Sequence, residues 1–66
     1  MVQQVSLFKA CELCVSADGR VNRMGKIWSP SLDEVRAVAI QMLQSPTTLR
    51  VEIVSDNGVT LEVLRR

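Results

Sequence analysis

The sequence contains no histidine and no tyrosine, and only two cysteines, among its 66 residues. Without histidine, the Ser–His and Cys–His pairs of nucleophilic catalysis cannot form, and a zinc site within one chain lacks its usual ligands. The three glycines are isolated from one another, so no glycine-rich phosphate loop is present. We therefore predict a protein that is not an enzyme and has no catalytic residues, no metal site and no cofactor.

Long apolar runs are also missing. No run approaches the roughly 20 residues that a membrane-spanning helix needs, and no basic segment precedes an apolar stretch as in a secretory signal. We expect a cytoplasmic protein with reduced cysteines and no membrane partner. The net charge of +1 gives no strong global attraction to nucleic acid. A hydrophobic content of 47% indicates a folded chain, and the length indicates a single domain over residues 1–66.

The most regular segment predicts a helix from Ser31 to Gln44. Ser31 and Glu34 have the spacing of a capping box, in which the serine hydroxyl accepts from the backbone of the glutamate. Ser45-Pro46 ends the helix, because the residue before a proline avoids the α conformation. The expected apolar face consists of Leu32, Val35, Val38, Ala39, Met42 and Leu43.

A hairpin is predicted at the C-terminal end, where alternating apolar residues flank Asp56-Asn57-Gly58. A two-residue turn would place Ile53 opposite Glu62 and bury a charge. We therefore predict a three-residue loop with Gly58 in the left-handed conformation, which places Ile53 opposite Leu61.

The N-terminal third contains a similar loop, Ala17-Asp18-Gly19. It predicts strands near Ser6–Val15 and Arg20–Trp28, joined as a second hairpin. The alternative is a helix over residues 6–16, where apolar residues also recur at helical spacing. We expect Trp28 to cover one end of the core.

These elements predict a small α+β domain of order β-β-α-β-β, in which one helix packs on one face of an antiparallel sheet. The other face is left open and carries both apolar and charged side chains, which suits a homodimer or a partner surface. The first hairpin adds to this face either Phe8, Cys14 and Met24 or the residues of opposite parity. The predicted partner-binding residues are Glu52, Val54, Glu62, Leu64 and Trp28.

Two further features carry candidate chemistry. Cys11 and Cys14 are spaced like a redox pair, but on a strand they point to opposite faces, which favours a structural role over an intersubunit metal site, a disulfide or redox chemistry. Basic residues provide an alternative function, contact with nucleic-acid phosphates, although two aromatics are too few for a base-stacking platform. The candidate phosphate contacts are Arg20, Arg23, Lys26, Arg65 and Arg66.

The layout of residues 5–64 resembles small orphan proteins of bacteria and their phages, among them phage inhibitors of host defence. The resemblance is architectural and carries over no residue. The absence of catalytic parts and the uncovered sheet face together predict a protein that acts by occupying a surface of another protein. A phage or mobile-element inhibitor, such as an anti-CRISPR, is one concrete form. We therefore predict a non-enzymatic interaction module that self-associates and binds a protein partner of unspecified identity, with a small nucleic-acid-binding protein as the alternative.

Overall fold

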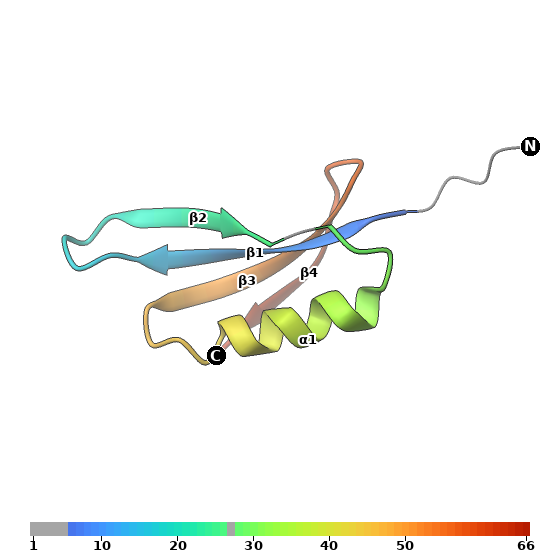
Figure 1. Ribbon diagram of the computed structural model, residues 1–66. Coiled ribbons are helices and arrows are strands. Elements are labelled where there is room, and N and C mark those ends of the chain that lie inside the picture. The colour runs from blue at the N-terminus through green and yellow to red at the C-terminus, as the bar shows by residue number, and fades with distance from the viewer. Residues whose placement is uncertain (1–5, 27) are drawn as a thin grey trace, which may run out of the picture.

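The computed structural model describes residues 6–26 and 28–66, which form four strands and one helix. Strands β1 (Phe8–Val15) and β2 (Val21–Gly25) precede helix α1 (Leu32–Met42), and strands β3 (Thr48–Ser55) and β4 (Thr60–Arg65) follow it. The strands form one antiparallel sheet in the order β2-β1-β3-β4 (Figure 1). The predicted α+β fold is confirmed, and the N-terminal third is a hairpin rather than a helix.

Both hairpins have the predicted three-residue loops. Ser16 N–H donates to the Arg20 carbonyl at 2.8 Å, and Ser55 N–H donates to the Val59 carbonyl at 2.8 Å. Each loop ends in a glycine of positive φ, which is +85° in the first loop and +86° in the second. A residue with a side chain would lose about 1–2 kcal/mol of stability at either position, because its Cβ disfavours positive φ. Glycine therefore suits both positions.

Helix α1 begins at the predicted cap. The Ser31 hydroxyl accepts from Glu34 N–H at 3.2 Å. The Glu34 carboxylate does not return directly to the Ser31 backbone. Instead it accepts from the Ser29 hydroxyl at 3.2 Å, and that hydroxyl accepts from Ser31 N–H at 3.2 Å. The capping box is therefore closed through Ser29, which satisfies the same backbone donor by one additional step.

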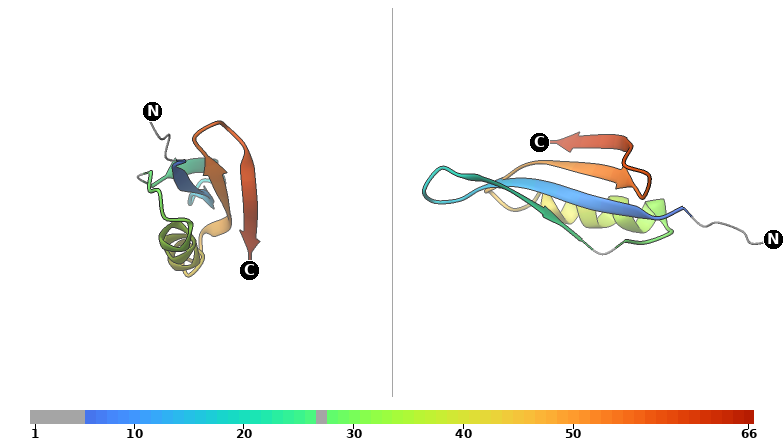
Figure 2. Two further views of the ribbon diagram at one scale, coloured as in Figure 1. Left: turned by 90° about the vertical axis from the view of Figure 1, so that its right-hand side faces the viewer. Right: turned by 90° about the horizontal axis from the view of Figure 1, so that it is seen from above.

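The core lies between α1 and the two central strands, with the helix inside the curve of the sheet (Figure 2). The predicted apolar face of the helix is confirmed, since every member is buried or packs against the core. The sheet contributes Ala10, Val51 and Ile53, each no more than 1% exposed. The loop of the first hairpin projects beyond the helix, and all five residues of β2 are exposed.

The predicted register of the second hairpin is wrong beyond its loop. Val54 pairs with Thr60 as the loop requires, but Ile53 then pairs with Glu62 across a β-bulge, so that Leu61 is the extra residue. An extra residue reverses the side-chain parity of the rest of the strand. The Glu62 carboxylate, which now lies on the helix side, has an ion-pair partner there. Arg36 on the helix donates to Glu62 Oε2 from Nε at 3.0 Å and from Nη2 at 2.9 Å.

Trp28 does not cover the end of the core, contrary to prediction. It is 38% exposed. The Lys9 ammonium nitrogen lies 4.6 Å from the centre of its ring, within the range of a cation–π contact. Within residues 6–26 and 28–66, no helix has the length and apolar character needed to cross a bilayer.

A candidate interaction face on the open side of the sheet

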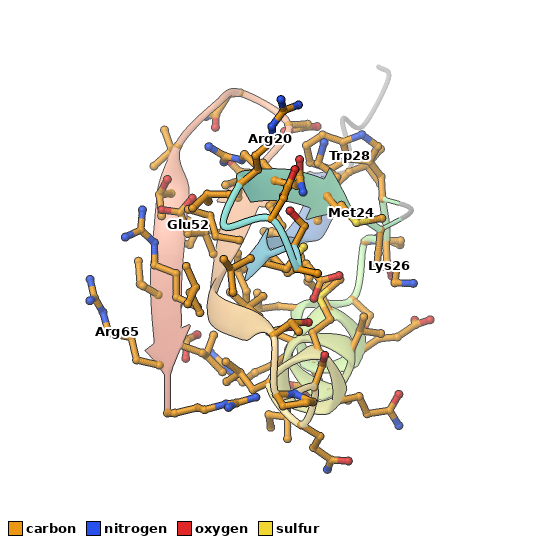
Figure 3. All side chains as sticks on the ribbon, turned by 90° about the vertical axis from the view of Figure 1, so that its left-hand side faces the viewer. Arg20, Met24, Lys26, Trp28, Glu52 and Arg65 are labelled. Atoms are coloured by element: carbon orange, nitrogen blue, oxygen red, sulfur yellow. The ribbon has the colours of Figure 1, made fainter. Side chains whose placement is uncertain are left out.

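The face of the sheet opposite α1, here called the open face, is defined by strand pairing. Ala10 and Ile53 pair with each other and lie in the core under the helix. Because successive residues on a strand point to opposite faces, their neighbours point away from the helix. Figure 3 shows Glu52 and Arg65 on this side. The open face consists of Lys9, Cys11, Leu13, Val15, Val21, Arg23, Gly25, Arg50, Glu52, Val54, Thr60, Val63 and Arg65.

One line of paired residues crosses all four strands. Leu13 pairs with Arg23 on one side and with Arg50 on the other, and Arg50 pairs with Arg65. We call Arg23, Arg50 and Arg65 the arginine row. Neighbouring strands lie about 4.8 Å apart, so the row extends over about 14 Å. The backbones of three arginines therefore lie along one line across the strands.

Glu52 is the one carboxylate that the four strands place on the open face. Its side chain is 15% exposed and forms ion pairs with two members of the row. Arg23 Nη2 lies 3.2 Å from Glu52 Oε1, and Arg50 Nη2 lies 3.6 Å from Glu52 Oε2. With the ammonium group of Lys9, four cations share the face with one carboxylate, which leaves a formal charge of +3.

The two ends of the arginine row differ in how far ion pairs neutralise their charge. Arg50 and Arg65 are directly opposite each other, a destabilising arrangement for like charges. Arg65 has no ion pair within the described part of the chain. Arg50 Nε is buried and has no hydrogen-bond partner there either. The Arg50–Arg65 end is thus the least neutralised part of the face.

Apolar groups surround these charges. Val63 is 42% exposed, while Leu13 and Val54 are partly buried by their neighbours. Cys11 is only 4% exposed, whereas Cys14 lies on the helix side of β1, so the two thiols point to opposite faces as predicted. Both cysteines are free. Their positions fit the structural interpretation, since Cys11 Sγ lies against Gly25 of the neighbouring strand.

The predicted partner-binding residues are divided between two faces. Glu52 and Val54 lie on the open face, and Trp28 lies beside it through its contact with Lys9. Leu64 and Glu62 do not lie there, because the bulge turns both toward the helix. Leu64 packs against the core, and Glu62 binds Arg36. Their predicted place on the open face is wrong, since parity was counted along an uninterrupted strand.

The predicted phosphate contacts are also scattered. Arg23 and Arg65 belong to the arginine row. Arg20 lies near the tip of the first hairpin, 3.4 Å from Asp18. Lys26 lies on the helix side (Figure 3), and Arg66 Nε donates to the Leu43 carbonyl at 3.0 Å.

Sequence reasoning left Arg50 and Lys9 out of both candidate sets. The alternation of Arg50 with Glu52 and Val54 does place it on the open face. Its position opposite Arg65, however, depends on the bulge in β4, which has no signature in the sequence.

A concave feature lies beside the helix. A cavity of about 360 Å³ separates α1 from the β1–β2 edge, and Lys26, Ser29, Glu34 and Val38 contribute to its lining. The Glu34 carboxylate is already engaged by the Ser29 hydroxyl at the helix start. Among the residues that the structure describes, no group of three or more histidine, cysteine or acidic side chains is arranged to hold a metal ion.

Comparison of the chain with models of protein families, with curated proteins and with solved structures finds no match.

Proposed function

We propose that this protein is a non-enzymatic interaction module that binds another protein through the open face of its sheet. The observation that carries the proposal is a four-stranded sheet with a helix on one face and nothing from the described chain on the other. That face combines two exposed valines, Val21 and Val63, with three arginines and lies beside Trp28, which is 38% exposed. Arginine and tryptophan are the residues most enriched at the energetic centres of protein interfaces.

A protein partner is favoured over nucleic acid by the apolar side chains that lie among the charges of the open face. Val63 is 42% exposed there, and a phosphate backbone has no group that would bury it. Trp28 is the one aromatic residue beside the face, too few for a platform of stacked bases. Nucleic-acid binding is nevertheless the second candidate, because Arg23 and Arg65 share one row. It predicts an affinity that falls steeply with added salt.

Self-association is a separate part of the proposal. Two copies that stacked their open faces would bring two arginine rows together, so this face favours a partner of opposite charge. A homodimer would more readily use the free edge of β2, where all five residues are exposed and alternate residues direct their backbone groups away from β1. Sedimentation equilibrium of the purified chain tests this point directly. One concrete form of the proposed protein-binding function is the inhibition of a host defence system by a phage protein.

The test is a tagged pull-down from the source organism's lysate, run in parallel with and without nuclease. The informative variant is the double substitution Val54→Ala and Val63→Ala on the open face. Its control is Ile40→Ala, which removes an apolar side chain of similar exposure, 52%, from the helix. Far-UV circular dichroism establishes that each variant is folded.

We expect one protein to be retained by the wild type and by the helix variant, in both nuclease conditions, and to be lost from the open-face variant. Retention by all three chains would contradict the proposal. Loss of all bound material after nuclease would instead support nucleic-acid binding.

A further inference from the structure

We propose that the arginine row receives an acidic segment of the protein partner, with carboxylates bound at Arg50 and Arg65. This inference rests on the proposed function and adds to it the chemical class of the partner. Three properties of the arginine row support it, namely its uncompensated charge, its remaining hydrogen-bond donors and its apolar surroundings.

The first property is the opposition of Arg50 and Arg65. Two arginines directly across from each other on neighbouring strands repel, and the fold supplies no carboxylate between them. Glu62 is the acidic residue nearest along β4, but the bulge has turned it toward Arg36. A carboxylate from outside the chain would convert this repulsion into two favourable pairs.

The second property is donor capacity. A guanidinium group has five N–H donors in a rigid fork. Glu52 holds Arg23 and Arg50 through one terminal nitrogen each, so the other terminal nitrogen of each arginine has no carboxylate partner, although Nε of Arg50 is buried. Since the Glu52 side chain is only 15% exposed, it acts from beneath the row and holds these guanidinium groups in place. Because these guanidinium groups are already ordered, they lose less conformational entropy when a partner binds.

The third property is the apolar margin of the row. Leu13 lies within it, and Val63 lies beside Arg65 in the next line of paired residues. A protein segment can place both carboxylates and aliphatic side chains on such a surface, whereas a phosphate backbone has no groups for the valine and leucine. A second copy of this chain would present the same positive face. An acidic protein segment therefore matches the surface better than either.

The direct experiment is a nuclear magnetic resonance titration of the ¹⁵N-labelled protein with a synthetic decaglutamate peptide. An oligothymidylate of ten nucleotides and a decalysine peptide are titrated in parallel. We expect decaglutamate to shift the amide signals around Leu13, Arg50 and Arg65 and to leave those of α1 unchanged. Decalysine should bind more weakly than decaglutamate.

The informative variant is Arg65→Glu, and its control is Lys26→Glu. Both change the net charge from +1 to −1, but Lys26 lies on the helix side of the sheet. Loss of a charge-assisted pair should weaken decaglutamate binding about tenfold in the Arg65 variant. The control should change it less than about twofold, since only long-range, screened electrostatics differ.

Thermal stability separates a binding role from a structural one. Because Arg65→Glu replaces a like-charge opposition with an attractive pair, its unfolding midpoint should rise, by about 1–8 °C for a domain of this size. A variant that binds less but is more stable shows that Arg65 serves the interface. A lower midpoint together with lost binding would overturn the proposal.

The other overturning outcomes are distinct. Equal decaglutamate affinity in the wild type and the Arg65 variant would rule out an acidic segment at the row. Tighter binding of the oligonucleotide than of decaglutamate would assign the row to nucleic acid. A homodimer dissociated by Arg65→Glu would assign it to a second copy. If decaglutamate fails while the Val54/Val63 variant still loses its captured protein, the proposed function stands and only the acidic partner is wrong.

Discussion

Asp18 shows how a single side chain can organise a loop. Its carboxylate accepts a hydrogen bond from the Ser16 hydroxyl and another from Arg20 N–H, the latter at 3.2 Å. Gly19 supplies the left-handed backbone that closes the turn. These contacts involve the charged form of the carboxyl group, so the loop and the ionisation of Asp18 are coupled.

The pKa of Asp18 is lowered from its ordinary value, chiefly by the Ser16 hydroxyl and then by the Arg20 backbone. A depressed folded-state pKa stabilises the fold fully above the unfolded-state value, and the contribution is lost as the pH falls through the folded-state value. We expect Ser16→Ala to raise this pKa toward the ordinary aspartate value, as measured by carboxyl ¹³C shifts. The control is Ser45→Ala, which alters a hydroxyl in another loop. An unchanged Asp18 pKa in the Ser16 variant would contradict the assignment of cause.

The bulge in β4 is the element that decides which side chains meet. Without it, Glu62 would face Glu52 on the open face, where both would compete for the same arginines. With it, Glu62 joins Arg36 across the helix–sheet boundary, and Leu64 packs toward the core. One extra residue thus separates the two glutamates and leaves the open face basic.

A double-mutant cycle on Arg36→Ala and Glu62→Ala tests this register. Both side chains are partly exposed, at 43% and 37%, so solvent screens the pair. The expected coupling is about 0.5–1 kcal/mol, the upper range for a surface pair with two hydrogen bonds. Urea unfolding of the four proteins measures it. A parallel cycle of Arg36 with the exposed Asp33 should give a smaller value, and no coupling to Glu62 would contradict the bulge.

The start of α1 gives a second test on a single element. Ser31→Ala removes the acceptor for Glu34 N–H and should destabilise the protein by about 1 kcal/mol. Ser31→Asp keeps an acceptor at this position and should retain most of the stability. Urea midpoints compare the two variants, and equal losses would show that the capping hydrogen bond is not the source of the effect.

The whole molecule depends on a small core with one layer of helix on one layer of sheet. Its fully buried large side chains are Val51 and Ile53, both from β3, which pairs with strands on both sides. A domain of this length rarely has more than about 3–5 kcal/mol of net stability. The free energy lost when one such side chain is removed is therefore comparable with the entire net stability of the domain.

We expect Ile53→Ala to cost about 2–5 kcal/mol and to leave much of the chain unfolded at 25 °C. Ile53→Val should cost about 0.5–1.5 kcal/mol and retain the fold. Far-UV circular dichroism and urea titration distinguish the two. A cooperative, nearly unchanged transition for the alanine variant would mean that the core includes support beyond the contacts described.

Much of this structure was determined by the sequence alone, because the causes are local. The two three-residue loops follow from a small set of turn residues ending in glycine, and the start of α1 follows from Ser31 and Glu34. The apolar face of the helix and the opposite directions of Cys11 and Cys14 follow from simple periodicity. Each of these features depends on residues within one turn or one strand.

The composition of the open face was decided only by the tertiary structure. Arg23, Arg50 and Arg65 come from three strands, and their alignment requires the register of three strand pairs at once. Leu64 was assigned to the wrong face because a bulge reverses parity without a sequence signal of its own. Its cause is non-local, since the extra residue brings Glu62 to Arg36 and Leu64 to the core, and those contacts exist only once the helix has packed on the sheet.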